Sequence, residues 1–161
     1  MGQTVCFTGH RHIPDEQYAQ LWDSLLAVIE EQIASGALIF RTGGALGFDT
    51  MAALAVLSLR KRFPDIRLEL ILPCPSQTRG WAKSDTVLYE QIKSQADSVR
   101  YVSTGYYAGV LQQRNRALVE NSDVCVAYLC NSSGGGTAYT ASLALKNGLE
   151  LINLAEQLPH T

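Results

Sequence analysis

The chain has few charged residues and no basic excess. Charged residues make up 17% of its 161 residues, and its formal net charge is −2. A protein that holds DNA or an anionic membrane by broad electrostatic attraction carries a basic surface, so neither partner is expected here. A local site for one anionic group remains compatible with this composition.

Long apolar runs and closely paired cysteines are also missing. No apolar run reaches the roughly 20 residues of a membrane span, and no basic start precedes an apolar stretch as in a signal peptide. We therefore expect a cytoplasmic protein without membrane contact. The cysteines are Cys6, Cys74, Cys125 and Cys130. They form no CxxC pair, so we expect buried thiols in a reducing compartment rather than disulfides.

The sequence alternates between short apolar segments and segments with helical spacing of apolar residues. The predicted strands are 4–9, 37–43, 67–73, 99–102, 123–129 and 149–154. The predicted helices cover about 14–35, 48–63, 78–96, 108–121 and 137–147. Strands joined by helical crossovers form a parallel sheet with helices on both faces. No linker or repeat interrupts the pattern, which predicts one three-layer α/β domain over 1–161 with a mostly parallel sheet of about six strands.

In such a sheet, ligands bind beyond the carboxyl ends of the strands, near the point where the strand order reverses. The segments that follow the predicted strands are 8–12, 42–49, 73–81, 103–115 and 130–137. Most of them hold glycine directly after the strand, and several add polar or cationic side chains. We therefore predict that these five loops share one edge of the sheet and form a ligand site there.

Two of these loops, "GGALG" (43–47) and "SGGGT" (133–137), are rich in glycine and lead into predicted helices. Glycine lets backbone N–H groups approach a ligand, and a helix start adds unpaired donors with a partial positive charge. Neither loop has the spacing of a standard nucleotide-binding motif, and each is also compatible with a simple tight turn. We predict phosphate contacts from Gly134, Gly135, Gly136 and Thr137. We predict that Gly43 and Gly44 hold the sugar side.

Asp49 follows the first glycine loop directly. A carboxylate in a first helical turn can complement the helix dipole, or it can accept hydrogen bonds from ribose hydroxyls. We predict Asp49 as a ligand-binding residue, and it is also the candidate acid/base residue if the protein catalyses a reaction.

The first loop, "TGHRH" (8–12), adds Thr8, Gly9 and Arg11 to the predicted site. The guanidinium of Arg11 suits phosphate or carboxylate, although a surface ion pair is an alternative. His10 and His12 are too few to suggest a metal, so no metal site is expected.

Arg114 and Arg116 lie two residues apart on a predicted helix and therefore face different directions. Arg114 is nearer the helix start, so we predict that it contacts the ligand. Tyr106 and Tyr107 in the preceding loop could stack on a base or fill space under the loop, and the sequence leaves both interpretations open.

Five segments together resemble the YpsA-like (DUF1273) branch of the SLOG superfamily, which also includes DprA/Smf DNA-processing proteins and LOG phosphoribohydrolases. These are "FTGHR", "TGGALGFDTMAA", "LP", "QQRNRALVENSDVCVAY" and "GGGTAYTASLA". The resemblance covers nearly the whole chain. It implies a Rossmann-like fold, a site for nucleotide-derived ligands at the carboxyl edge, and a link to bacterial cell division or stress.

The family's enzymes place a glutamate after their glycine motif, in a pattern like PGGxGTxxE. In this chain Ser133 stands at the first glycine, and Tyr139 and Thr140 stand where the acid is expected. The departure argues against phosphoribohydrolase activity.

We therefore predict a module that binds or senses a nucleotide-derived ligand such as NAD, ADP-ribose or an AMP-like molecule, with no required cofactor and without clear evidence of catalysis. The first alternative is a hydrolase of an N-glycosidic or phosphate bond. The second is a DprA-like DNA-associated protein, against which the lack of a lysine-rich stripe counts. The apolar face of 48–60 suits the core or a homodimer, and both remain open.

Overall fold

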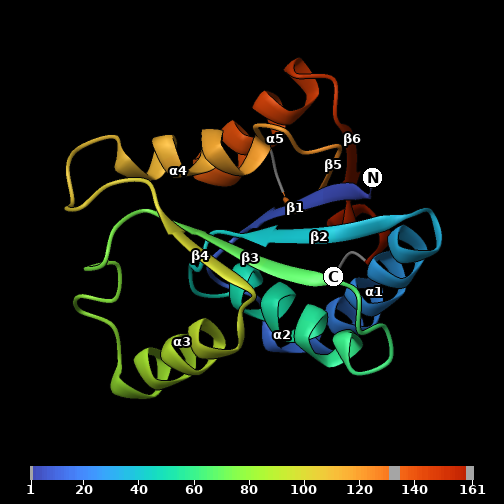
Figure 1. Ribbon diagram of the computed structural model, residues 1–161, viewed down its shortest axis with the longest axis horizontal. Helices are drawn as coiled ribbons and strands as arrows, with labels where there is room; N and C mark the ends of the chain where they lie inside the picture. Colours follow the sequence, from blue (N-terminus) through green and yellow to red (C-terminus); the bar gives the residue numbers. More distant parts are fainter. Residues whose placement is uncertain (1, 131–134, 159–161) are drawn as a thin grey trace.

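A computed structural model describes residues 2–130 and 135–158 as a six-stranded parallel sheet between two layers of helices (Figure 1). The strands are β1 (Gln3–Gly9), β2 (Ala37–Thr42), β3 (Arg67–Leu72), β4 (Ser98–Tyr101), β5 (Val124–Tyr128) and β6 (Glu150–Asn153). The helices are α1 (Asp15–Ala34), α2 (Phe48–Arg60), α3 (Lys83–Gln95), α4 (Val110–Val119), α5 (Gly136–Lys146) and the 3-10 helix η1 (Leu154–Gln157). The predicted fold class is confirmed.

The strand order is β4-β3-β2-β1-β5-β6, and every neighbouring pair is parallel. From β1 the chain builds the sheet outward through β2, β3 and β4, and then crosses to β5 and β6 on the other side. The order therefore reverses between β1 and β5. At such a point the loops that follow the two strands diverge, which leaves a crevice at the carboxyl edge.

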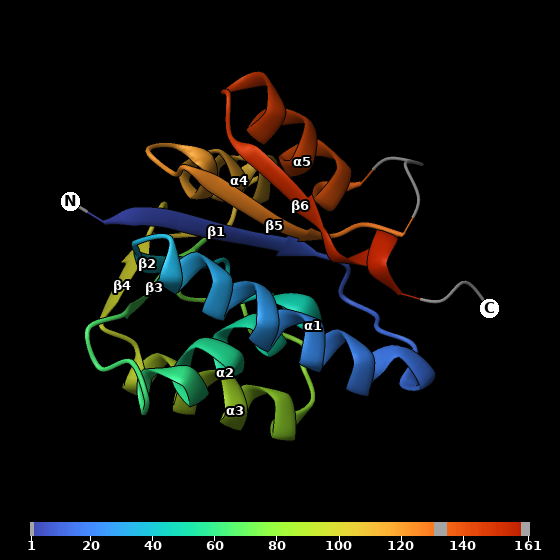
Figure 2. The same cartoon turned by 90° about the vertical axis from the view of Figure 1, so that its right-hand side faces the viewer.

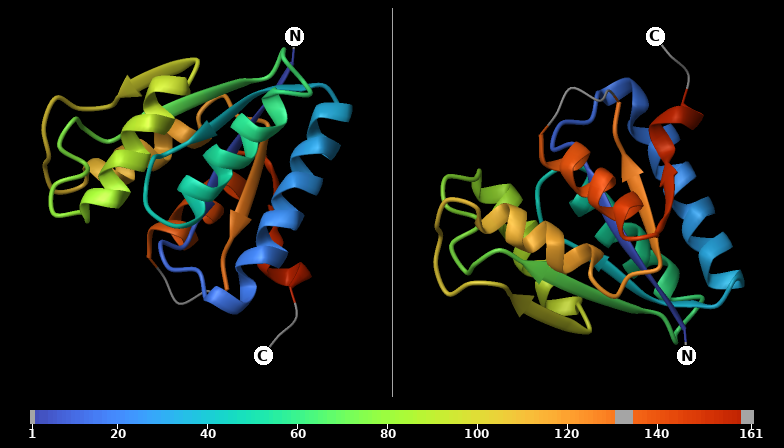
Figure 3. Two further views of the ribbon diagram at one scale, coloured as in Figure 1. Left: turned by 90° about the horizontal axis from the view of Figure 1, so that it is seen from below. Right: turned by 90° about the horizontal axis from the view of Figure 1, so that it is seen from above.

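The helices cover both faces of the sheet. Helices α1, α2 and α3 lie on one face, and α4 and α5 lie on the other (Figures 2 and 3). The larger apolar cluster lies under the first group and includes Phe7, Phe40 and Phe48. Helix α2 contributes eight of its 13 residues to this cluster. Because the core already occupies the apolar face of α2, this face gives no support to the homodimer that the sequence left open.

One helix is shorter than its sequence pattern predicted. Helix α3 begins at Lys83 rather than near residue 78, because the preceding segment folds into consecutive turns. In these turns the amides of Gln77, Arg79 and Trp81 donate to carbonyl groups three residues earlier, at 3.2, 3.0 and 3.0 Å. The turns direct the 74–82 segment over the carboxyl edge of the sheet.

The cysteines depart from the prediction at one position. Cys6, Cys74 and Cys125 are buried as expected, but Cys130 is exposed because it lies beyond the end of β5. Cys6 and Cys125 are register partners on neighbouring strands. In the described part of the chain, no helix combines the length and the apolar character that a membrane span requires.

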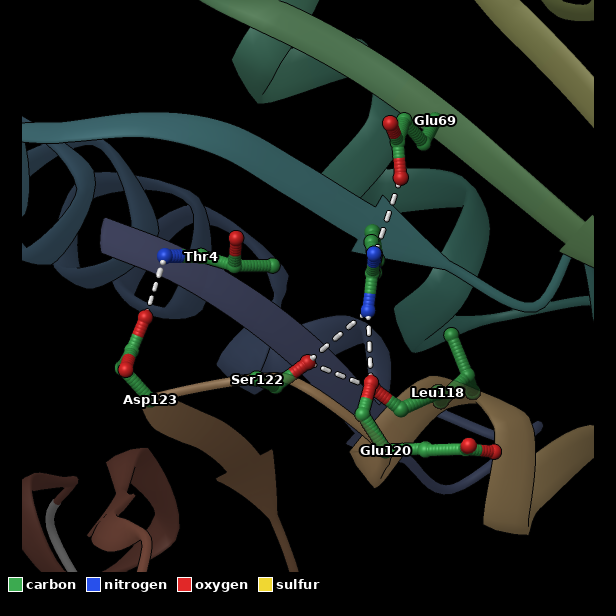
Figure 4. A network of polar contacts seen from close by, with 7 residues as sticks. Thr4, Glu69, Leu118, Glu120, Ser122 and Asp123 are labelled. Atoms are coloured by element: carbon green, nitrogen blue, oxygen red, sulfur yellow. Dashed lines mark hydrogen bonds and ion pairs between the residues drawn. The ribbon is translucent and has the colours of Figure 1, made fainter. Parts of the chain in front are cut away.

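A polar network around Arg41 of β2 joins the two halves of the sheet. Figure 4 shows its partners Glu69, Glu120 and Ser122. Arg41 Nε donates to Glu69 Oε1 on β3 at 2.9 Å, and Nη1 donates to the carbonyl of Glu120 at 2.8 Å. The hydroxyl of Ser122 donates to the carbonyl of Leu118 at 2.6 Å. Arg41 Nη1 also donates to the Ser122 hydroxyl at 3.5 Å. Glu120 and Ser122 lie between α4 and β5, so Arg41 anchors the crossover between the two halves of the sheet.

Candidate functional site

A cavity of about 280 Å³ opens at the carboxyl edge of the sheet, where the strand order reverses. We call it the first cavity. Its lining residues come from the end of β1 and the loops or helices that follow β1, β2, β4 and β5. They are Thr8, Gly9, His10, Arg11, Ala45, Asp49, Leu111, Arg114, Asn115, Gly136 and Thr137. Segments far apart in the sequence therefore converge on one site.

The loops after β1 and β2 pack against each other through glycine. A Cβ on Gly9 would lie 2.3 Å from the ring of Phe48, and a Cβ on Gly47 would lie 2.1 Å from the carbonyl oxygen of Arg11. The amide of Phe48 donates to the carbonyl of His10 at 3.1 Å. This close approach brings Arg11 to the start of α2, which carries the candidate carboxylate.

Arg114 lies at the base of the first cavity and is only 5% exposed. Its Nη1 donates to the carbonyl of Gly43, and its Nε donates to Asn115 Oδ1 at 2.8 Å. A Cβ on Gly43 would lie 2.6 Å from Nη1, so glycine is required at position 43 for the guanidinium to fit. Among the described residues no hydrogen bond engages Nη2, which leaves donor capacity for a ligand.

Asp49 is the one carboxylate among the described residues that line the first cavity. It is buried in the first turn of α2, and its Oδ2 accepts a hydrogen bond from the amide of Ala45 at 3.2 Å. Burial raises the pKa of Asp49, and the charges of Arg114 and Arg11 together with the amide hydrogen bond oppose this effect. The carboxylate therefore sits in a predominantly cationic environment.

His10 adds a neutral polar group to the cavity wall. Its Nε2 accepts a hydrogen bond from the amide of Cys130 at 2.9 Å, which requires a lone pair on that nitrogen. Partial burial lowers the pKa of His10 below its ordinary value. The neutral ring therefore carries its proton on Nδ1 and can act as a donor from that atom.

The start of α5 closes the cavity on the β5 side. Gly136 and Thr137 are the first two helical residues and line the cavity, so the unpaired amides of the first turn are near the space a ligand would occupy. A Cβ on Gly136 would lie 3.7 Å from Asn115 Nδ2, and a Cβ on Gly135 would meet no atom of the described residues within 4 Å. The first turn of α5 thus offers the backbone arrangement of an anion site.

Most of the predicted site residues meet at the first cavity. Those that line it are Thr8, Gly9, Arg11, Asp49, Arg114, Gly136 and Thr137. Gly43 and Gly44 do not line it, and instead pack against Arg114 and Leu72. Gly135 caps α5 just outside the lining, and Gly134 lies outside the described residues. Ligand contacts by these residues stay predictions.

The sequence left some lining residues unassigned. Ala45, Leu111 and Asn115 also line the first cavity, and so does His10, which was considered from the sequence only as a metal ligand. Asn115 follows Arg114 directly in the "RN" pair, and its amide holds the neighbouring guanidinium. The position of Asn115 next to a predicted ligand-binding arginine was the feature of the sequence that could have assigned it to the site. For Leu111 the sequence offered no signal that separates it from a core leucine.

A second cavity, of about 400 Å³, lies beside the first. Its lining residues are Arg11, Pro73, Cys74, Ser76, Gln77, Arg79, Trp81, Tyr106 and Leu111. Arg11 and Leu111 line both cavities, so the two are neighbours. Among the described residues, no group of three or more His, Cys, Asp or Glu side chains could hold a metal ion.

The strand order, the parallel crossovers and a cavity at the reversal point define a Rossmann-like α/β protein with a cavity at its carboxyl edge. The model of the YpsA family, described as the YspA SLOG family, matches residues 6–151. The chain belongs to this family.

Curated relatives support this assignment. The chain is 32% identical over 129 residues to YoqJ, an uncharacterized SPbeta prophage-derived protein from Bacillus subtilis strain 168. This alignment covers 72% of this chain and 75% of YoqJ. It is 31% identical over 107 residues to a UPF0398 protein from Bacillus thuringiensis strain Al Hakam. That match covers 65% of this chain and 58% of the relative, so the aligned region is little more than half of the UPF0398 protein.

Two solved structures share the fold. DNA processing protein A from Helicobacter pylori, in a structure concerned with its single-stranded DNA binding mode, superposes with a TM-score of 0.64 at 21% identity. The match covers 92% of this chain and 63% of that one. The protein TM1055 superposes with a TM-score of 0.58 at 17% identity, over 96% of this chain and 79% of that one. At these identities the likeness establishes the fold alone.

Proposed function

We propose that the protein binds a nucleotide-derived ligand, such as an AMP-like molecule, ADP-ribose or NAD, with a phosphate group in the first cavity. The observation that carries the proposal is the convergence of three anion-binding features on one cavity. They are the buried guanidinium of Arg114, the exposed Arg11 and the first turn of α5. A helix start and two guanidinium groups together favour a dianionic group.

The charges of the cavity support an anionic ligand rather than a cationic one. Arg11 and Arg114 face a single carboxylate, Asp49, whose pKa is raised by burial. Within the described residues the side chain of Arg11 has no ion-pair partner, so it is available to a ligand. Asp49 supplies acceptor oxygens for the hydroxyl groups of a ribose.

Calorimetric titration with AMP, ADP-ribose and NAD tests the proposal. Arg11→Ala should weaken binding by about 10- to 100-fold, because a charge-assisted hydrogen bond to phosphate contributes about 1.5–3 kcal/mol. The matched control is Arg67→Ala, which removes an exposed arginine at the amino end of β3, outside both cavities. No measurable binding of any of the three compounds would refute the proposal.

A second variant probes the first turn of α5. Gly136 has no positive φ, so Gly136→Val adds volume in the first cavity without backbone strain. We expect loss of nucleotide binding with an unchanged circular dichroism spectrum. Gly135 is less suitable because its φ of 94° strains any side chain placed there.

A DNA-associated function is the alternative that the structural similarity to DNA processing protein A favours. DNA processing protein A, which shares the fold, is described as binding single-stranded DNA. The net charge of −2 speaks against broad capture of a polyanion. Titration with oligo(dT) at two salt concentrations separates the alternatives, since DNA binding through phosphates weakens steeply as salt rises.

A further inference from the structure

We propose that the second cavity receives the heteroaromatic base of the ligand while the first cavity holds its phosphorylated sugar. This inference rests on the proposed function and adds to it the part of the ligand that determines specificity. It identifies the ligand as an extended molecule with an anionic end and a planar aromatic end, which bind on opposite sides of Arg11.

The size and position of the cavities support one ligand across both. Small-molecule sites usually enclose about 300–1,000 Å³. The first cavity, at about 280 Å³, lies just below this range, whereas the two together lie well inside it. Because Arg11 and Leu111 line both cavities, a ligand can extend from one to the other past these two side chains.

The walls of the second cavity suit a planar ring. Trp81 and Tyr106 line it, and Tyr106 is 72% exposed without any described hydrogen bond to fix its hydroxyl. Aromatic side chains stack on bases of any identity, and an arginine such as Arg79 adds a second planar, cationic surface. Among the described residues that line the first cavity, by contrast, the one aromatic side chain is the imidazole of His10.

The turns that shortened α3 hold Trp81 in position. Its ring meets the ring of Tyr89 edge to face, with centroids 5.5 Å apart and planes at 88°. The amide of Trp81 is fixed by its hydrogen bond to Thr78. A ring held by packing on one side and bordering a cavity on the other loses little conformational freedom when a base stacks on it.

Gln77 provides a polar edge beside the rings. Its Oε1 accepts a hydrogen bond from the hydroxyl of Tyr89 at 3.0 Å, and its Nε2 donates to the carbonyl of Gly43 at 3.1 Å. These bonds orient the amide and use one lone pair and one hydrogen. The remaining lone pair and hydrogen can recognise the edge of a base. Gln77 also touches the carbonyl that holds Arg114, which couples the two cavities.

The test compares AMP with ribose 5-phosphate, which lacks the base. In the unmodified protein AMP should bind about 10-fold or more tightly than ribose 5-phosphate in calorimetric titrations, because only AMP can stack. In Trp81→Ala this difference should disappear, while the affinity for ribose 5-phosphate stays within about twofold. Thermal melting of each variant checks that it is folded.

Two further variants keep the test decisive if Trp81→Ala fails to fold. Tyr106→Ala removes an exposed ring, and Trp81→Phe retains the packing on Tyr89; both should reduce the preference for AMP without affecting ribose 5-phosphate. Tyr18→Ala, an exposed tyrosine on α1 outside both cavities, is the matched control. It should leave both affinities unchanged.

Fluorescence gives a readout that a merely structural role would not produce. The chain has two tryptophans, so Trp22→Phe leaves Trp81 as the single tryptophan, whose emission is excited selectively at wavelengths that tyrosine does not absorb. AMP should quench this emission and ribose 5-phosphate should not.

The outcomes separate this inference from the proposed function. Equal affinities for AMP and ribose 5-phosphate in the unmodified protein would overturn the inference and leave the phosphate site intact. Absence of binding by ribose 5-phosphate and by all three of AMP, ADP-ribose and NAD would overturn both. Displacement of AMP by oligo(dT) at low salt, with loss of both in Trp81→Ala, would assign the rings to single-stranded DNA and overturn the small-ligand inference.

Discussion

At the scale of one residue, Gly43 in the loop after β2 must be glycine because another side chain occupies the space beside it. The space that its Cβ would take is filled by the guanidinium of Arg114, which also bonds the Gly43 carbonyl. The glycine therefore allows an arginine to be buried beside the first cavity. It does so through protein packing, and no ligand is needed to account for it.

Gly43→Ala should destabilise the protein by about 1–3 kcal/mol, because the added methyl group must displace a buried guanidinium. Gly105→Ala is the control, since no atom in the described part of the chain lies within 4 Å of a Cβ at that position; its effect should stay within about 1 kcal/mol. Urea denaturation measures both. Equal effects of the two substitutions would contradict the packing role of Gly43.

Asp49 makes the stability of the protein depend on pH. The folded protein keeps a proton on this carboxyl group after the unfolded chain has lost it, because burial raises the pKa above its ordinary value of 3.8. The folded state then binds more protons, so its stability falls as the pH rises from 3.8 to the raised pKa. Above the raised pKa this contribution stays constant.

Asp49→Asn removes this ionisation. Its stability relative to the unmodified protein should therefore increase with pH across that window and then level off. Denaturation curves of both proteins from about pH 4 to about pH 8 measure the difference. A difference that does not change with pH would show that the Asp49 pKa is not raised.

At the scale of elements, the Arg41 network joins β2, β3 and the end of α4. The side chain of Arg41 is only 18% exposed and makes charge-assisted bonds to Glu69 and to the carbonyl of Glu120. Removal of a half-buried cation would leave these acceptors without their partner. The crossover that carries the chain from one half of the sheet to the other would lose its anchor.

We expect Arg41→Ala to lower the free energy of unfolding by about 1.5–3 kcal/mol. Arg62→Ala provides the comparison, because Arg62 pairs with Glu30 while its side chain is 67% exposed; its loss should cost about 1 kcal/mol at most. Chemical denaturation in low and high salt distinguishes them. A loss of similar size in both variants would contradict the anchoring role of Arg41.

At the scale of the whole molecule, the arrangement of the carboxyl edge bears on catalysis. Cleavage of a ribosyl bond builds positive charge on the sugar and needs an anionic group or a base nearby. In the described lining of the first cavity Asp49 is the single carboxylate, and helix α5 carries Tyr139 and Thr140 near its start and contains no acidic residue. Thr140 is buried and bonds the carbonyl of Gly136 at 2.9 Å.

We therefore expect no appreciable release of free base from AMP or cytokinin-type nucleotides, even when they bind. Incubation of the purified protein with each nucleotide, followed by chromatography for the base, measures this. Release of base that is abolished in Asp49→Asn would establish a hydrolase with Asp49 as its acid/base residue.

The sequence by itself determined the order of strands and helices and the edge on which the site lies. Strands and helices could be predicted because the spacing of apolar residues along the sequence reflects which side of each element is buried. Examples are the apolar segment 67–73 and the helical spacing of 48–60. Parallel pairing then places every loop after a strand at one edge. The sequence alone therefore placed the loops with Arg11, Asp49 and Arg114 together at one edge of the sheet.

Only the tertiary structure decided how these loops pack. The occupation of the Gly43 space by Arg114 depends on side chains 71 positions apart, and no local pattern encodes such a contact. The turns before α3 interrupted a segment with helical composition and placed Trp81 at a second cavity. Packing between distant segments overrides local propensity there, because Gln77 bonds Gly43 and Tyr89. Trp81 also packs on Tyr89, and these contacts form only in the folded chain.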